Sequence, residues 1–116
     1  MDLNGKRVLV VGLGKSGVAS ALFLKAHGAR VTVSDTKTGD ELRSEIPVLL
    51  DHGITVETGG HGERTFRGQD LIVVSPGIPL DAPALVQARA LGGSVIGEIE
   101  LAARFLRGRG PRDRRR

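Results

Sequence analysis

The fold of this chain follows from VLVVGLGKSG, residues 8–17. The four apolar residues predict a buried strand, and the alanine- and leucine-rich segment after the glycines predicts a helix. The glycines have the spacing G-x-G-x-x-G and stand between a strand and a helix, as this motif requires. We expect Gly12 to permit the tight turn, Gly14 to let a ligand approach the backbone, and Gly17 to let the helix pack on its strand. Because a helix start presents free N–H groups and a positive dipole end, the turn predicts a phosphate or diphosphate site without identifying the ligand.

Composition limits the classes of protein to which the chain can belong. Its 116 residues suffice for one domain with a single packed core. The absence of cysteine excludes disulfides and thiolate metal sites and favours a cytoplasmic location. No apolar run approaches the length of a membrane span, and residues 1–7 lack the apolar stretch of a signal peptide. With three Phe, no Tyr and no Trp, the chain is poorly suited to stack the bases of single-stranded nucleic acid.

Positive charge is concentrated at the end of the chain. Residues 107–116 contain six arginines and one aspartate, whereas the preceding 106 residues contain eleven cationic and twelve acidic residues. A short basic tail either binds nucleic acid without sequence specificity or is a disordered chain end. Because the rest of the chain is nearly neutral, we expect one domain over residues 1–107 and a basic disordered tail over residues 108–116. Neither a membrane nor a specific nucleic acid is an expected partner.

Strand and helix signals alternate along the chain. Strands are predicted at Arg7–Val11, Arg30–Ser34, Ile54–Glu57, Leu71–Val74 and Ser94–Ile96. Helices are predicted at Lys15–His27, Asp40–His52, Ala82–Leu91 and Glu98–Leu106, with a polar loop over Thr58–Gln69. Pro47 is expected to break the second helix or to restart a turn. The alternation predicts an α/β fold, a doubly wound sheet of five parallel strands in the order 3-2-1-4-5 with helices on both faces.

Ligands of such a sheet bind beyond the carboxyl ends of the strands, where the winding direction reverses. This rule selects Gly12–Gly17, Asp35–Lys37 and Ser75–Pro79, which should converge on one crevice. Asp35 is placed either to contact a ligand, as the acid that binds an adenosine ribose does, or to cap the next turn as an exposed side chain. The segment 75–77 exposes N–H groups and a hydroxyl after a buried strand, which favours a binding role over an ordinary turn.

The sequence predicts neither catalytic residues nor a metal site. Lys15-Ser16 after Gly14 is reminiscent of a triphosphate loop, but the glycine which that motif needs further upstream is replaced by Leu9. No two of the three histidines have the spacing of metal ligands. Glu98 and Glu100 are two residues apart, so they face different sides of a helix and are expected to be acids of its first turn.

Four segments, in this order, resemble the N-terminal domain of the Mur ligase family. They are KRVLVVGLGKSG (6–17), VSDTK (33–37), DLIVVSPGIPL (70–80) and VIGEIELA (95–102), and the resemblance covers residues 5–108. It implies a Rossmann-like domain that holds the UDP part of UDP-N-acetylmuramoyl-L-alanine and no nicotinamide cofactor. The combination of the third and fourth segments is much more specific than the glycine turn alone.

The resemblance also implies which residues contact the nucleotide. The backbone of Lys15 and Ser16 would meet the diphosphate, Asp35–Lys37 the uracil end, and Ser75–Gly77 would line the pocket. Lys37 stands where relatives also have an arginine, which weakens a planar contact to uracil. The expected binding residues are Gly14, Lys15, Ser16, Gly17, Asp35, Thr36, Lys37, Ser75, Pro76 and Gly77.

The implied activity is the ATP-dependent addition of D-glutamate in peptidoglycan synthesis, a step of cell-wall biogenesis on which cell shape and division depend. A central domain with ATP and Mg²⁺ and a C-terminal domain that presents D-glutamate would carry the chemistry, so this chain alone is expected to be inactive. Where the family continues with an apolar strand, the chain has PRDRRR (111–116), so a frameshift, a truncated gene or a designed fragment is expected. The alternatives are a small NAD-binding module of a dehydrogenase or regulatory protein, and an adaptor with a basic tail.

Overall fold

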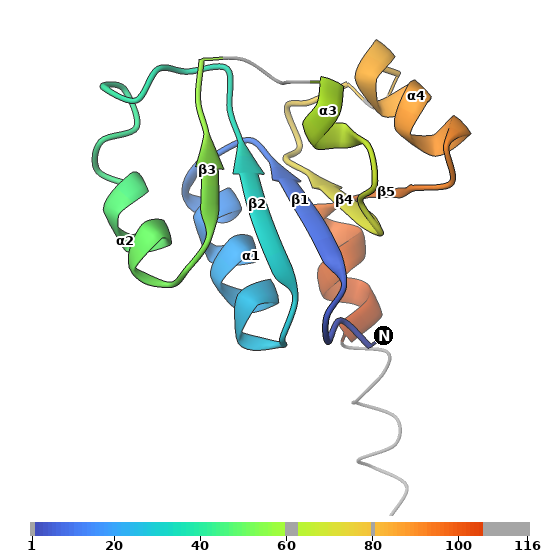
Figure 1. Ribbon diagram of the computed structural model, residues 1–116, viewed down its shortest axis with the longest axis horizontal. Coiled ribbons are helices and arrows are strands. Elements are labelled where there is room, and N and C mark those ends of the chain that lie inside the picture. The colour runs from blue at the N-terminus through green and yellow to red at the C-terminus, as the bar shows by residue number, and fades with distance from the viewer. Residues whose placement is uncertain (1, 60–62, 80, 106–116) are drawn as a thin grey trace, which may run out of the picture.

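The computed structural model describes residues 2–59, 63–79 and 81–105 (Figure 1). Five strands form one parallel sheet in the order β3-β2-β1-β4-β5, which confirms the predicted topology. The strands are β1 (Arg7–Val11), β2 (Arg30–Ser34), β3 (Thr55–Glu57), β4 (Leu71–Val74) and β5 (Ser94–Gly97). The order places β1 at the centre of the sheet and directs the loops that follow β1 and β4 to the same edge, which the doubly wound fold uses for ligands.

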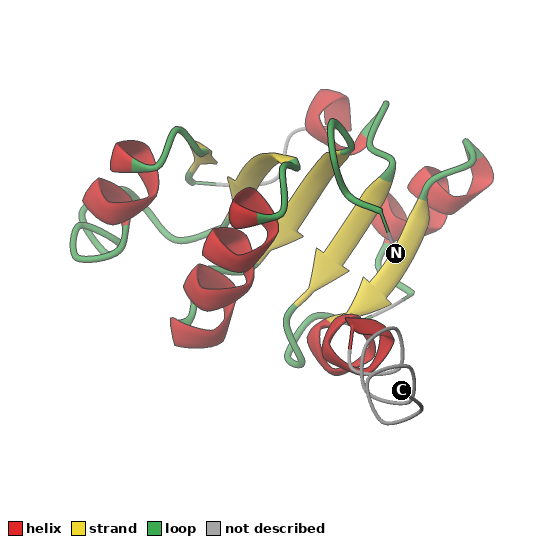
Figure 2. Cartoon of the chain, turned by 90° about the horizontal axis from the view of Figure 1, so that it is seen from below, coloured by secondary structure: helices red, strands yellow, loops and turns green. Residues whose placement is uncertain are grey.

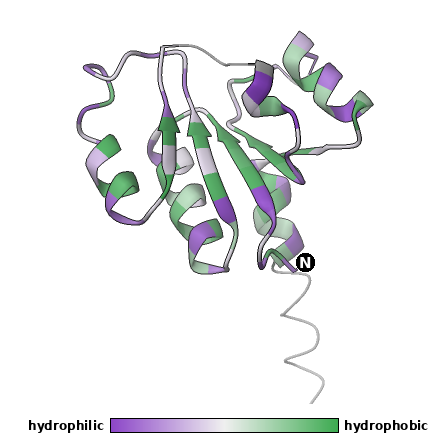
Figure 3. Cartoon of the chain, in the orientation of Figure 1, coloured by the Kyte–Doolittle hydropathy of each residue, from purple (hydrophilic) through white to green (hydrophobic). Residues whose placement is uncertain are grey.

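Helices cover both faces of the sheet (Figure 2). On one face lie α1 (Lys15–Ala26), α2 (Ile46–Asp51) and the helical residues 98–105, and on the other lie α3 (Glu63–Phe66) and α4 (Pro83–Ala90). Successive side chains of a strand point to opposite faces, so Val8 and Val10 pack under α1 whereas Leu9 and Val11 pack under α3 and α4. The central strands are therefore hydrophobic along most of their length, and only the amino-terminal ends of β1 and β2 are hydrophilic (Figure 3).

Glycines at three helix ends turn the chain into the following segment. Gly28 after α1, Gly53 after α2 and Gly92 after α4 have positive φ angles of 88°, 75° and 97°, which other residues rarely adopt. His27 and His52 occupy the C-caps of α1 and α2, each directly before a glycine, and each ring nitrogen contacts the carbonyl oxygen four residues earlier. The third histidine, His61, lies outside the described residues.

The prediction of one helix over Asp40–His52 is wrong in its first half. Residues 39–45 form turns, in which Thr38 and Glu41 each accept the other's backbone N–H at 3.3 and 3.0 Å. Helix α2 begins only at Ile46, with Pro47 in its first turn. The physical reason is that a proline ring lacks an N–H and clashes with the carbonyl one turn earlier, so a helix starts at proline rather than passing through it.

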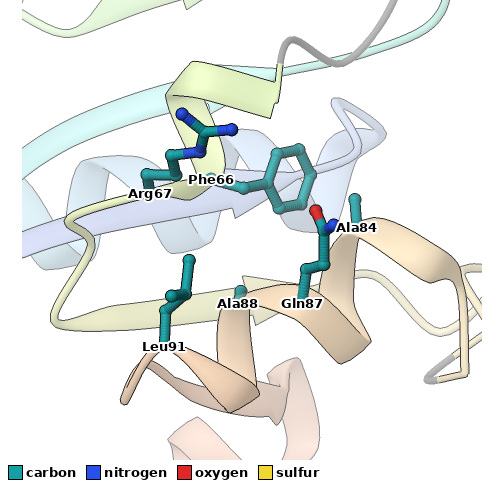
Figure 4. Close-up of a pocket in the computed structure, with 6 residues that line it drawn as sticks. All are labelled: Phe66, Arg67, Ala84, Gln87, Ala88 and Leu91. Carbon is teal, nitrogen blue, oxygen red and sulfur yellow. The ribbon is translucent and has the colours of Figure 1, made fainter.

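The predicted loop over Thr58–Gln69 contains a short helix, α3, which the sequence analysis missed. Its last residue, Phe66, is buried against α4, where it lines a small pocket with Ala84 and Ala88 (Figure 4). Burial of one aromatic ring against the sheet stabilises this turn, although the polar residues around it predict a loop. Smaller corrections are that β3 begins at Thr55 and β5 extends to Gly97. The residues of the predicted tail, 108–116, lie outside the described part.

Candidate functional site

The three segments selected from the sequence meet at the carboxyl edge of the sheet. Gly12 N–H donates to the carbonyl oxygen of Ser34 at 2.8 Å, which attaches the glycine turn to the end of β2. Ser75 N–H donates to the carbonyl oxygen of Val11 at 3.1 Å, which attaches the segment after β4 to the same turn. The glycine turn therefore stands between the other two segments and is joined to both.

The three glycines of the turn have different surroundings. Gly12 has φ +102°, and a Cβ atom there would lie 2.6 Å from Ser75 Oγ. A Cβ atom on Gly17 would collide with the carbonyl oxygen of Gly12, whereas no described residue beyond the chain neighbours comes within 4 Å of the position that a Cβ of Gly14 would occupy. The roles of Gly12 in the turn and of Gly17 in close packing are confirmed, and the space above Gly14 is open, as ligand approach requires.

The start of α1 presents exposed backbone N–H groups to this open space. Gly14 is the N-cap of α1, and no side chain caps it with a hydrogen bond. The first amides of a helix have no acceptor within the helix, and Gly14, Lys15 and Ser16 are exposed at the surface. The arrangement presents N–H groups, the positive end of the helix dipole and one lysine to an incoming anion.

Asp35 is buried, with 8% of its surface exposed, and its carboxylate already binds two backbone amides. Oδ2 accepts the N–H of Leu13 at 2.6 Å, and Oδ1 accepts the N–H of Lys37 at 2.8 Å. Of the two alternatives for Asp35, that of an exposed turn acid is therefore wrong about exposure, although the bond to Lys37 does cap the turn. The sequence analysis did not foresee the bond to Leu13, which ties the glycine turn to the segment after β2.

The two residues after Asp35 are exposed, so their side chains are available to a ligand at this edge. Thr36 and Lys37 follow the end of β2, and the Lys37 carbonyl oxygen accepts the N–H of Gly59 at 2.8 Å. This bond fixes the backbone of the segment against the residues after β3 and leaves the lysine side chain outside the core.

Glu98 is the residue of this edge that the sequence analysis missed. Ser75 Oγ donates to Glu98 Oε2 at 3.1 Å and lies 3.4 Å from the carbonyl oxygen of Gly12, so one hydroxyl links the ends of β4 and β5 to the glycine turn. Ser75, Pro76 and Glu98 line a depression of about 140 Å³, which the glycine turn and Asp35–Lys37 do not line. Glu98 directly follows a strand, as Ser75 does, and this shared position is the signal that could have identified it.

The second acid of the helix that follows β5 has a structural partner. Glu100 forms an ion pair with Arg104 at 2.9 Å along the same helix, so Glu98 and Glu100 bind different partners, as their spacing predicts. Over the described residues, His, Asp and Glu side chains form no group of three or more that could hold a metal ion. In the same part of the chain, every helix is too short or too polar to cross a lipid bilayer.

Comparison with solved structures supports the fold. UDP-N-acetylmuramate-alanine ligase MurC from Thermotoga maritima superimposes with a TM-score of 0.72 at 21% identity, over 88% of this chain and 23% of that protein. A pseudomurein peptide ligase type C from Methanothermus fervidus superimposes with a TM-score of 0.70 at 25% identity, over 84% of this chain and 20% of that protein. At these identities the comparison establishes a shared Rossmann-like architecture.

Comparison of sequences identifies the family. UDP-N-acetylmuramoylalanine–D-glutamate ligase from Koribacter versatilis is 72% identical over 108 residues, which cover 93% of this chain and 24% of that relative. The chain thus spans about a quarter of the length of the relatives it matches. The family described as Mur ligase MurD-like, N-terminal domain, matches residues 6–97. On this evidence the chain belongs to the MurD-like Mur ligases and carries their N-terminal domain.

Proposed function

We propose that this chain binds the UDP part of UDP-N-acetylmuramoyl-L-alanine for a ligase that adds D-glutamate during peptidoglycan synthesis in the cytoplasm. The observation that carries the proposal is the union of three loops around the open helix start at Gly14. Membership of the MurD-like family supports the choice of a UDP-linked substrate over a nicotinamide dinucleotide. The alternative of an NAD-binding module has in its favour the shared architecture, the glycine turn and the position of Asp35, but not the family.

The proposed contacts follow from where each group lies. The diphosphate binds the amides of Lys15 and Ser16, because a phosphate at a helix N-terminus gains both hydrogen bonds and dipole attraction. The uracil end binds beside Thr36 and Lys37, whose side chains are exposed. The Asp35 carboxylate holds the backbone of the glycine turn and of Lys37 through two amide bonds. Its oxygens can accept further hydrogen bonds from a ligand. Ser75, Pro76 and Gly77 form the wall on the side of β4.

The described residues do not fit ATP with Mg²⁺. Leu9, which stands where a triphosphate loop needs glycine, is a buried residue of β1, and the described part holds no cluster of metal-ligand side chains. We therefore assign ATP and Mg²⁺ to the portions of the relatives that this chain does not match. Given ATP, Mg²⁺, UDP-N-acetylmuramoyl-L-alanine and D-glutamate, this chain should release no phosphate above background.

A titration followed by amide NMR tests the proposal. UDP-N-acetylmuramoyl-L-alanine, and UDP more weakly, should shift the amides of residues 14–17, 35–37 and 75–77. NAD at the same concentration should shift them much less. Binding of NAD as tightly as the UDP-sugar would favour the dinucleotide alternative and contradict the proposal.

A further inference from the structure

A second polar depression lies at the amino edge of the sheet, at the opposite end of the strands from the glycine turn. It has a volume of about 290 Å³. Its polar walls come from β1, α1, β2, β3 and the turn before β4, and they comprise Arg7, Lys25, Arg30, Thr32, Thr55 and Gln69. Among the described residues no acidic side chain lines it, although acids outnumber bases by one over residues 1–106. The positive charge here is therefore a local property of this edge.

Two of the cations face each other across adjacent strands. Arg7 of β1 is the register partner of Arg30 of β2, so their backbones are separated by the usual spacing of paired strands, about 4.8 Å. Both side chains leave the sheet on the same side, and like charges placed directly opposite each other are destabilising. Arg7 and Arg30 are the first residues of β1 and β2, whose amino-terminal ends are hydrophilic in Figure 3.

Lys25 adds a third charge from the last turn of α1. A Cβ atom on Gly53 would lie 3.6 Å from Lys25 Nζ, and a Cβ atom on Gly68 would lie 3.6 Å from Arg7 Nη1. Both glycines have positive φ angles, 75° and 73°, so both turns are built for a residue without a side chain. The two cationic groups lie against bare backbone, which keeps the depression open between them.

The acids closest in sequence to the depression, Asp51, Glu57 and Asp70, are not among its lining residues. Asp70 Oδ2 accepts the backbone N–H of Arg7 at 2.8 Å, and Glu57 Oε1 accepts the hydroxyl of Thr65 at 2.5 Å. Within the described ranges, neither Arg7, Lys25 nor Arg30 forms an ion pair with an acid. The side-chain charges of the cluster are thus not ion-paired within the described protein, and the nearest bonded carboxylate, that of Asp70, contacts the backbone of Arg7.

We propose that this depression is a second binding site, distinct from the nucleotide edge, for a small phosphate-bearing anion such as a diphosphate. Two guanidinium groups offer forked donors that match phosphate oxygens, and the lysine adds a point charge. The hydroxyls of Thr32 and Thr55 and the amide of Gln69 add neutral polar groups around the same space. A bound dianion or trianion offsets the repulsion between Arg7 and Arg30. Binding therefore stabilises the folded arrangement in which these two side chains lie side by side.

The probe is inorganic pyrophosphate, titrated into the full 116-residue chain at constant ionic strength and followed by amide NMR. Saturable shifts are expected at residues 7, 25, 30–32 and 53–55. Pyrophosphate also resembles the diphosphate of a nucleotide, so it can shift the amides of residues 14–17 as well. Those shifts test the nucleotide site, and the shifts at the amino edge test the second site, so each proposal can fail without the other. Orthophosphate should bind the depression more weakly, and citrate, an anion of similar charge without phosphate geometry, should bind at least fivefold more weakly than pyrophosphate.

A pair of charge-matched variants separates this site from general attraction to a basic chain. Arg7→Gln with Arg30→Gln should weaken pyrophosphate binding at the amino edge at least tenfold. Arg43→Gln with Arg64→Gln, which removes the same charge from two exposed positions outside the depression, should change it less than twofold. The first variant should be as stable to urea as the parent, because it relieves repulsion and removes no core side chain. Equal weakening in both variants, citrate binding equal to pyrophosphate, or no saturable shift at the amino edge would each overturn the proposal.

Discussion

The two ends of the central strands offer positive charge to a ligand in different ways. At the carboxyl edge, the donors are the amides of Lys15 and Ser16 at the start of α1. The turn before them is held by hydrogen bonds that join Leu13 to Asp35 and Gly12 to Ser75. At the amino edge, the donors are the side chains of Arg7, Lys25 and Arg30, held by strand register and two glycine turns. The first arrangement depends on backbone geometry, and the second depends on the identity of the side chains. Substitutions that disturb the turn at the carboxyl edge should therefore lower the stability of the fold. Substitutions of the cationic side chains at the amino edge should weaken anion binding and leave stability unchanged.

The largest effect is expected from Gly17→Ala. Helix propensity alone favours alanine over glycine by about 1 kcal/mol. The added Cβ collides with the Gly12 carbonyl oxygen, however, so we expect the free energy of unfolding to fall by about 2–3 kcal/mol in urea denaturation. The matched control is Gly14→Ala, which meets no atom within 4 Å and should cost less than about 1 kcal/mol. A stabilised Gly17→Ala chain would contradict the close packing of the turn.

Asp35→Asn should follow, with a loss of about 2 kcal/mol in the free energy of unfolding. Asparagine has one acceptor oxygen, so either the Leu13 or the Lys37 amide loses its partner in a buried place. Asp40→Asn removes the same charge from an exposed turn and should change stability by less than about 0.5 kcal/mol. Equal effects of the two substitutions would show that Asp35 acts only through its charge.

Gly14→Val tests the ligand side of the same turn. A branched side chain at Gly14 fills the space that a diphosphate needs, so binding of the UDP-sugar should weaken at least tenfold, which corresponds to about 1.4 kcal/mol. The circular dichroism spectrum should stay close to that of the parent, because no protein atom occupies that space. Pyrophosphate binding at the amino edge should be unchanged. Undiminished nucleotide binding would contradict the proposal that the diphosphate binds at the start of α1.

The smallest effect on stability is expected from the hydrogen bond between Ser75 and Glu98, which joins the ends of β4 and β5. Ser75→Ala and Glu98→Ala should each lower the free energy of unfolding by about 0.5–1 kcal/mol, because both groups are only half-buried. In a double-mutant cycle their coupling energy should be about 0.5 kcal/mol. Strictly additive effects would mean that the hydrogen bond between them contributes nothing to stability.

Much of the fold could be predicted because the sequence pattern and the packing agree. Strand β1 and strand β4 are short valine-rich runs bounded by polar or glycine residues, and their predicted limits equal the observed ones. The errors lie where a single long-range contact decides the outcome. Phe66 converts a polar loop into a helical turn because it packs on α4, and no local periodicity reveals that contact.

The sequence by itself determined the strand order, the glycine turn and the three loops of the candidate site, because each follows from local patterns with a known geometric consequence. Only the tertiary structure decided what the side chains at the two edges do. Asp35 binds Leu13, which lies 22 residues away, Ser75 after β4 binds Glu98 after the neighbouring strand β5, and Arg7 stands opposite Arg30 through register. These pairings depend on which strands become neighbours and in which register, and that is fixed by the packing of the whole sheet rather than by any single segment.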